Sequence, residues 1–222
     1  MNWLQRKLAT SPMLARVAPF LIFLGLTFCQ GQFGETSRYW FYLAKTIVGA
    51  WMIWKVWPLV TEMRWKFTWE AAVVGVVVFG IWVGLDGFYR KFGNAGTPWN
   101  PQGEFGESAA LAWLFIVVRI AGSSVVVPPL EEVFYRSFLY RWIAKPDFQS
   151  VPLGCFHWKS FLLTAIIFGF SHHEWLAGIL CAFAYQGLVC WKKRLGDAMA
   201  AHAITNFLLG VWVVWKGAWQ FW

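Results

Sequence analysis

The sequence predicts an all-α, polytopic membrane protein of seven or eight transmembrane helices around a polar intramembrane cavity. Of its 222 residues, 59% are hydrophobic and only 14% are charged, whereas a soluble domain carries about 25% charged residues. The mean hydropathy is +0.50, and apolar runs near the length of a membrane helix, about 20 residues, recur along the chain. The 18 tryptophans are typical of membrane–water interfaces.

The net charge of +8 is explained by the membrane rather than by nucleic acid. Lys and Arg lie mostly near the ends of apolar runs, where they meet anionic lipid headgroups and set topology. No basic face or nucleic-acid-binding motif appears. The four cysteines, Cys29, Cys155, Cys181 and Cys190, form no CxxC pair, so we interpret them as small apolar residues and not as disulfides or metal ligands.

The N-terminal part, residues 1–107, is predicted to contribute membrane helices. After a short basic start, three apolar runs are expected to span the bilayer: residues 11–30, 38–60 and 68–88. Lys45 and Lys55 inside the second run are expected to extend toward an interface. The polar segment 89–107 is predicted to be a loop.

Five further runs are predicted as helices in the C-terminal part: residues 108–127, 129–144, 156–173, 175–191 and 198–215. Pro128 and Pro129 are expected to end the first of them, because proline is tolerated in the first turn of a helix but not in its interior. A new helix should therefore begin near Pro129. The basic segments can share one side of the membrane only if this new helix is not a full span, so charge leaves the orientation open.

Ionisable and amide side chains at membrane depth are costly and indicate function. Three clusters of them occur in the apolar second half of the chain. They are Glu131–Glu132 with Arg136, His172–His173–Glu174, and His202 with Asn206. The last pair is spaced i, i+4 and therefore lies on one helix face.

Each cluster also has a non-catalytic interpretation. Glu132 and Arg136 can form a local ion pair, His173 can anchor the helix at an interface, and His202 with Asn206 can hydrogen-bond to neighbouring helices. Their co-occurrence favours catalysis instead. A glutamate in a low-dielectric site can act as a base, a histidine can relay the proton, and a second histidine with an amide can stabilise an oxyanion.

A metal site is the alternative for the same residues. Glu131, His172 and His202 resemble the ligand set of a catalytic zinc ion. The His-Glu-x-x-His spacing that makes such a reading strong is absent from the sequence. We therefore expect no cofactor, with zinc as the alternative.

The three clusters resemble the motifs of one family. Glu131-Glu132-Val133-Phe134-Tyr135-Arg136 is similar to the EExxxR motif of the CPBP intramembrane protease family, also called the CAAX-protease, bacteriocin-processing or ABI family. Phe168-Gly169-Phe170-Ser171-His172 resembles its FxxxH motif, and His202-Ala203-Ile204-Thr205-Asn206 resembles its HxxxN motif. The motifs occur in the family's order within residues 108–215. Within the family, the chain is similar to the CAAX-protease-related branch associated with bacterial exosortase systems.

The resemblance implies a helical catalytic core over residues 108–222 and an endopeptidase of the bacterial inner membrane. Its substrate would be a membrane-associated or lipidated protein. Glu131 with His172 would activate water, His202 and Asn206 would bind the oxyanion, and Glu132 with Arg136 would support them. His173 has no counterpart in the motifs. The alternatives are a non-catalytic immunity or scaffold protein on the same fold and a transporter, which would usually show internal repeats.

The expected depth of His202 conflicts with a single site that contains all four residues. His202 follows the basic turn Lys192–Arg194 by only a few residues, about 10 Å of helix rise, so straight helices place it near one membrane face. His202 can approach Glu131 and His172 only if a segment is re-entrant or if that turn dips into the bundle. Irregular backbone at such depth must line a water-filled cavity. We expect such a cavity, large enough for an extended peptide.

Overall fold

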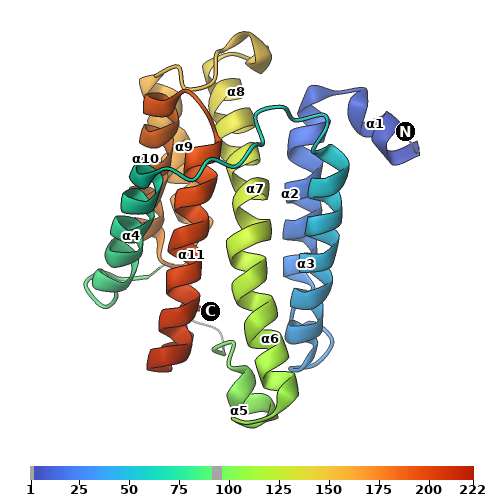
Figure 1. Ribbon diagram of the computed structural model, residues 1–222, viewed down its shortest axis with the longest axis vertical. Helices are drawn as coiled ribbons and strands as arrows, with labels where there is room; N and C mark the ends of the chain where they lie inside the picture. The colour runs from blue at the N-terminus through green and yellow to red at the C-terminus, as the bar shows by residue number, and fades with distance from the viewer. Residues whose placement is uncertain (1–2, 92–96) are drawn as a thin grey trace.

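The structure, a computed structural model, describes residues 3–91 and 97–222. In these ranges it is a bundle of helices without a β-strand, which confirms the all-α prediction (Figure 1). The helices are α1 (Trp3–Ala9), α2 (Pro12–Phe28), α3 (Ser37–Val56), α4 (Trp69–Gly84), α5 (Pro101–Phe105), a composite helix Ala110–Ala144, α9 (Trp158–Phe170), α10 (Trp175–Lys192) and α11 (Gly196–Lys216). Residues 92–96 of the predicted loop lie outside the described residues, and α5 is a short helix that the loop prediction missed.

Three of the described helices are long and apolar enough to cross a membrane: Ala110–Ala144, α10 and α11. The apolar helices α2, α4 and α9 have 17, 16 and 13 residues, fewer than the roughly 20 that a full span needs. α3 has 20 residues but carries Arg38, Lys45 and Lys55. The structure therefore supports several crossings, and the number seven or eight stays a prediction.

The paired prolines do not end a helix, so the prediction of two separate helices, 108–127 and 129–144, is wrong. A continuous helix of 35 residues runs from Ala110 to Ala144. It consists of α6 (Ala110–Ala121), the π-helical segment η1 (Gly122–Val126), α7 (Val127–Glu132), the π-helical segment η2 (Val133–Leu139) and α8 (Tyr140–Ala144).

The wider turn η1 explains how the helix passes the prolines. The N–H of Val127 bonds to the carbonyl of Gly122, five residues earlier, as in a π-helix. Such local adjustments let a membrane helix accept proline, provided that other groups satisfy the carbonyls left without an N–H. The two prolines thus mark a local change of helix type instead of a boundary.

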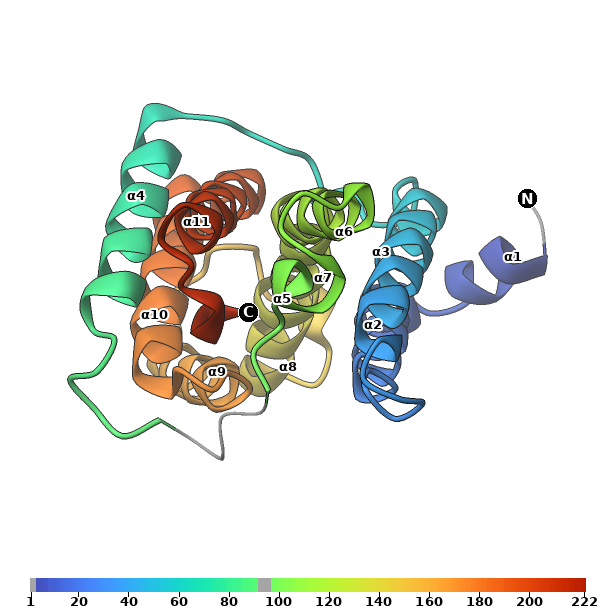
Figure 2. The same cartoon turned by 90° about the horizontal axis from the view of Figure 1, so that it is seen from below.

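The composite helix is the centre of the bundle. It lies between the pair α2–α3 on one side and α4, α9, α10 and α11 on the other (Figure 2). α11 packs closely on α4, where small residues allow the approach: a Cβ at Gly75 would lie 2.7 Å from the Ala201 carbonyl oxygen. Thr205 Oγ1 donates to the Gly75 carbonyl at 2.8 Å and accepts from Tyr185 at 2.7 Å.

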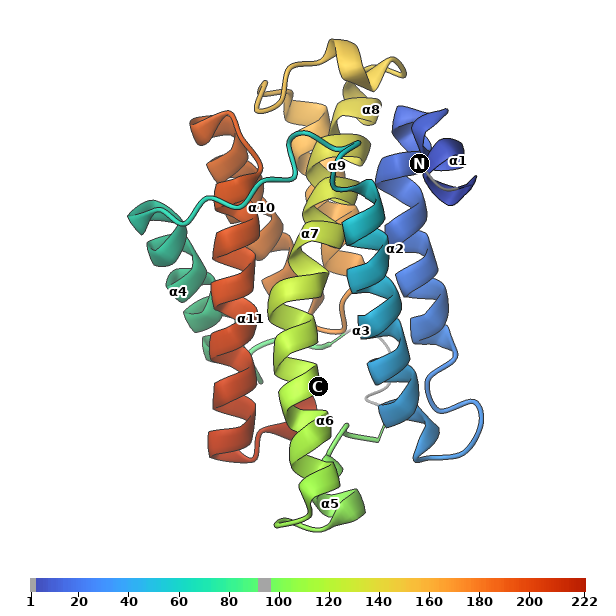
Figure 3. The ribbon, with the colours of Figure 1, turned by 45° about the vertical axis from the view of Figure 1, so that its right-hand side comes forward.

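α11 begins lower than the end of α10, and the segment 57–68 crosses in front of its first turn (Figures 1 and 3). The Lys66 N–H donates to the Gly196 carbonyl at 3.3 Å, and Thr68 donates to Asp197 at 2.7 Å. Because α11 starts at this depth, His202 reaches the level of α7, and no re-entrant helix is required.

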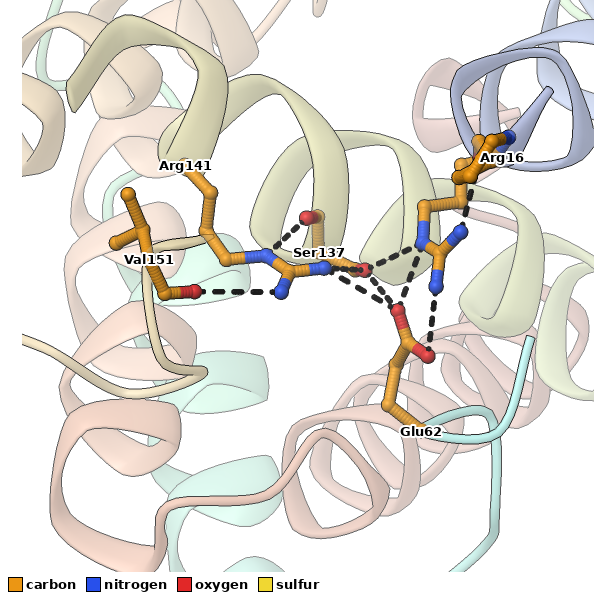
Figure 4. Close-up of polar contacts among 6 residues, drawn as sticks. Arg16, Glu62, Ser137, Arg141 and Val151 are labelled. Carbon is orange, nitrogen blue, oxygen red and sulfur yellow. Dashed lines mark hydrogen bonds and ion pairs between the residues drawn. The ribbon is translucent and has the colours of Figure 1, made fainter. Parts of the chain in front are cut away.

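A buried polar network fastens segment 57–68 to the helices (Figure 4). Glu62 accepts hydrogen bonds from Arg16 Nε at 2.8 Å and Nη2 at 3.0 Å, and also from Ser137. Arg141 Nη2 lies 3.4 Å from Glu62, and its Nη1 donates to the Val151 carbonyl at 3.4 Å. One carboxylate therefore joins α2, η2 and α8, and Arg141 extends the network to the loop after α8.

The network predicts how stability depends on pH. Burial alone would raise the pKa of Glu62, but the hydrogen bonds and charge of Arg16 lower the pKa below its ordinary value of 4.5. A lowered folded-state pKa stabilises the fold above about pH 4.5, and this contribution is lost as the pH falls through the folded value. Glu62→Gln should lower the free energy of unfolding by about 3 kcal/mol near pH 7, because two buried arginines lose their carboxylate.

Thermal unfolding of the purified protein in lipid nanodiscs at pH 7 and pH 4 measures this effect. The gap between wild type and Glu62→Gln should narrow at pH 4. Glu107→Gln, which alters an exposed carboxylate, is the control and should melt like wild type. An equal gap at both pH values would contradict the proposed contribution of ionised Glu62.

Candidate active site

A cavity of about 370 Å³ lies inside the bundle, between the composite helix and helices α2, α3, α9, α10 and α11. The four residues predicted to be catalytic, Glu131, His172, His202 and Asn206, all line it. They come from three separate segments of the chain, so the fold brings together the motifs that the sequence separates by up to 75 positions, from Glu131 to Asn206.

Glu132, beside Glu131, is the anchor of the site. Its side chain is completely buried, and its carboxylate lies 2.9 Å from His202 Nδ1 and 3.1 Å from Arg136 Nε. An ionised carboxylate only accepts hydrogen bonds, so Nδ1 of His202 is the donor and Nε2 is left for the cavity. The ion pair with Arg136 was expected from the i, i+4 spacing, whereas the bond to His202 was not.

Arg136 is held by aromatic rings as well as by Glu132. Its guanidinium carbon lies 4.5 Å from the centre of the Phe168 ring and 5.6 Å from that of Tyr135. The Phe168 ring also packs against His172, with ring centres 4.6 Å apart. Phe168, the first residue of the FxxxH motif, therefore forms the apolar wall between the buried arginine and the cavity.

Glu131 faces the cavity because it is one helical position before Glu132. Successive residues of a helix point about 100° apart, so Glu132 turns toward α11 and Glu131 turns toward the open space. Its Oε2 atom is buried and has no hydrogen-bond partner among the described residues. A carboxylate oxygen without a partner, beside a cavity, is available to a water or a ligand.

His172 lies in the short turn between the end of α9 at Phe170 and the start of α10 at Trp175. Its Nδ1 donates to the Phe168 carbonyl at 2.8 Å. That bond fixes the tautomer and leaves the lone pair of Nε2 free. The neighbouring residue His173 does not line the cavity.

Asn206 is positioned by Ser123, a residue that the sequence analysis did not single out. Its Nδ2 donates to the Ser123 carbonyl at 2.8 Å. That carbonyl precedes Pro128 by five positions and would bond to its N–H in a π-helix, but proline has none. The amide carries two N–H groups, so Asn206 can satisfy the carbonyl with one and offer the other to the cavity.

The cavity also contains two cations that the sequence analysis did not assign to the site, Lys45 and Arg119. Lys45 does not extend to an interface, as we expected from its place in an apolar run, because its side chain is buried against Phe23 and Tyr42. Both residues lie within apolar runs of the sequence, and this position could have identified them as candidate site residues.

The alternative zinc ligands do not form a metal-binding cluster. Within residues 3–91 and 97–222, no three His, Cys, Asp or Glu side chains are grouped closely enough to hold an ion. His202 Nδ1 is already bonded to Glu132, and His172 Nδ1 is bonded to Phe168. Only the Nε2 atoms of the two histidines remain for a ligand.

Fold and site define a helical membrane protein with a buried glutamate, histidine and asparagine site. Residues 108–208 match the family model described as type II CAAX prenyl endopeptidase Rce1-like. This part of the chain, which contains all three motifs, is similar to that family of proteases. No match was found among curated proteins or among solved structures. The family and the three apolar helices together indicate an integral, multi-pass membrane protein.

The buried pair predicts a large effect of Glu132. Glu132→Ala should lower the free energy of unfolding by about 3–5 kcal/mol, because Arg136 is left buried without a carboxylate. The double variant Glu132→Leu with Arg136→Met should recover most of this loss, since apolar residues of similar volume replace both charges. Urea or thermal unfolding in detergent measures both. Glu131→Ala, one position earlier, is the matched control and should cost far less; an equal cost would contradict the role of the ion pair.

Proposed function

We propose that the protein is an intramembrane endopeptidase that hydrolyses a peptide bond of a membrane-associated or lipidated protein. The observation that carries the proposal is the arrangement of Glu131, His172, His202 and Asn206 around one buried cavity. Each of these side chains except Glu131 is oriented by a hydrogen bond to another residue. Such fixed orientation is what a catalytic site needs.

Glu131 is the proposed general base, assisted by His172. The free Oε2 of Glu131 accepts a proton from a water molecule in the cavity, and the resulting hydroxide attacks the carbonyl carbon of the substrate. Nε2 of His172 accepts a hydrogen bond from the same water and orients it. The proton then passes to the nitrogen of the cleaved bond, which leaves as an amine.

His202 and Asn206 are the proposed oxyanion site. When the His202 ring carries a proton on both nitrogens, Nδ1 donates to Glu132 and Nε2 donates to the oxyanion. The second N–H of Asn206 donates from the adjacent turn of α11. Donors that are held in place before the reaction stabilise the charge of the tetrahedral intermediate without reorganising.

We also propose in which membrane the protein lies and how its chain is divided. We place the protein in a bacterial inner membrane, with residues 108–222 as the catalytic core and residues 1–107 as N-terminal helices of the same structural domain. Contributions from both parts to the cavity support a single domain: Phe23 and Trp82 line it together with the motif residues. We propose that the shorter helices α2, α4 and α9 cross or enter the bilayer with the three long ones.

Substitution of the proposed base should abolish cleavage. Glu131→Ala and His172→Ala should each reduce kcat/KM by at least about 100-fold, the usual contribution of a positioned acid or base. His202→Gln or Asn206→Ala should lower kcat by about 100- to 1,000-fold, as for an oxyanion donor. Cleavage of a proteome-derived peptide library by purified protein in nanodiscs, followed by mass spectrometry, measures these rates.

The control for this series is Glu107→Gln, which should cleave like wild type. Circular dichroism and melting temperatures confirm that each variant is folded. Equal cleavage by wild type, Glu131→Ala and His172→Ala would contradict the catalytic assignment. No cleavage of any peptide by folded wild type would favour the non-catalytic alternative on the same fold.

The proposed mechanism uses no metal ion, and chelators test this directly. Activity should be unchanged after incubation with EDTA or phenanthroline and removal of the chelator. Metal analysis of the purified protein provides a readout independent of activity and should give far less than one zinc per chain. Loss of activity with the chelator, followed by recovery with zinc, would instead support Glu131, His172 and His202 as ligands.

A further inference from the structure

Tyr135 brings a phenol hydroxyl to the wall of the cavity that contains Glu131. Its side chain is only 3% exposed, and it lines the cavity together with Glu131, Ser171 and His172. Tyr135 and Glu131 are four positions apart on the composite helix, a spacing that brings side chains to one face. The phenol is close enough to Glu131 for the charge of the carboxylate to act on it. The two groups therefore face the same space.

Aromatic packing holds the ring of Tyr135 in place but does not explain its hydroxyl. The rings of Phe20 on α2 and Phe168 on α9 meet the Tyr135 ring edge to face, with ring centres 5.5 and 5.0 Å away. Phenylalanine at position 135 would make the same ring contacts. A buried phenol hydroxyl usually requires a hydrogen-bond partner, so the partner of this one is informative.

The hydroxyl of Tyr135 has only a long hydrogen bond, to Ser171. It donates to Ser171 Oγ at 3.3 Å, whereas O–H···O bonds are usually about 2.7–2.8 Å long. Tyr185, also on the cavity wall, donates to Thr205 at 2.7 Å. Ser171 itself donates to the Phe168 carbonyl at 2.7 Å and keeps that bond without Tyr135. The Tyr135 hydroxyl can therefore turn to a substrate without loosening the end of α9.

The proposed reaction needs a proton donor for the leaving nitrogen, which departs as an amine only after it gains a proton. His172 has no proton to give, because its ring proton is on Nδ1 and bonds to the Phe168 carbonyl. His202 and Asn206, on α11, are assigned to the oxyanion. A phenol is neutral near pH 7, and its oxygen both donates and accepts hydrogen bonds. Tyr135 thus has the chemistry for this step.

We propose that Tyr135 is a catalytic residue that delivers a proton to the leaving nitrogen. As the C–N bond of the substrate breaks, the O–H bond of Tyr135 breaks and an N–H bond forms. The phenol oxygen takes up the proton that Glu131 received from the attacking water, so both side chains return to their starting states. The proposal rests on the proposed peptidase function and adds a proton donor to it.

A change of leaving group tests this role separately from binding. The peptide that wild type cleaves best is synthesised in two forms, one with its scissile amide and one with an ester in place of that amide. An alcohol leaves with less help from a proton donor than an amine does, so the two substrates differ mainly in the proposed step. Steady-state kinetics in nanodiscs give kcat and KM for both.

Tyr135→Phe should affect the two substrates differently. For the peptide, kcat should fall by at least about 100-fold, the usual contribution of a positioned acid. For the ester, kcat should fall by less than about tenfold, because the alcohol needs less protonation. KM should stay within about twofold for both, since an interaction made only in the transition state lowers kcat and leaves binding unchanged.

Tyr140→Phe is the matched control. Tyr140 is also buried on the composite helix, and its hydroxyl donates to the Cys155 carbonyl at 3.0 Å, outside the cavity. Its removal should leave the ratio of peptide to ester cleavage unchanged. Ser171→Ala removes only the resting partner of Tyr135 and should also keep the wild-type ratio. Melting temperatures show that each variant is folded.

The outcomes separate this proposal from the proposed function. An equal fall of kcat for peptide and ester in folded Tyr135→Phe, or the same change of ratio in Ser171→Ala, overturns the role of Tyr135 as proton donor. If Glu131→Ala abolishes cleavage of the peptide and Tyr135→Phe cleaves it like wild type, the peptidase stands and the proton donor fails. If folded wild type cleaves neither peptide nor ester, the peptidase fails and the proton donor fails with it.

Discussion

The burial of the Glu132 carboxylate is the constraint on which the rest of the structure depends. A carboxylate with no exposed surface is tolerated only where opposite charges and hydrogen bonds compensate it. Here the compensation comes from Arg136 on the same helix and from His202 on α11. The position of α11 relative to the composite helix is therefore set by the same group that orients a site histidine. Stability and geometry of the site have one common origin.

The residues that line the cavity could be predicted, because the prediction depends on residue type and on spacing within each helix. Glutamate, histidine and asparagine in apolar runs have few harmless roles, and i, i+4 spacing places Glu132 beside Arg136 whatever the tertiary fold. The partner of His202 could not be predicted in this way. Whether Glu131 or Glu132 faces α11 depends on the rotation of the helix about its axis, which the packing of neighbouring helices decides.

The errors of sequence reasoning have a common physical cause. The prolines were expected to end a helix, because the expectation assumed that their carbonyl partners would stay unsatisfied. Asn206, 83 positions away from Ser123, donates to one of them and lets the helix continue. The depth of His202 was left open by the sequence, because it depends on where the turn after α10 lies, and the contact of Lys66 with Gly196 fixes the start of α11. In both cases a contact distant in sequence decides the result.

The π-helical segment η1 sets the rotation of the second half of the composite helix about its axis. It lies between Arg119 and Glu131, so it fixes the rotation of one end of the cavity relative to the other. Successive residues of an α-helix are about 100° apart, whereas the wider turn of a π-helix rotates less per residue. The five π-helical residues Gly122–Val126 therefore set the faces on which Glu131 and Glu132 lie. A substitution that returned this turn to α-helical winding without removing a residue would rotate Glu132 away from α11 and Glu131 away from the cavity.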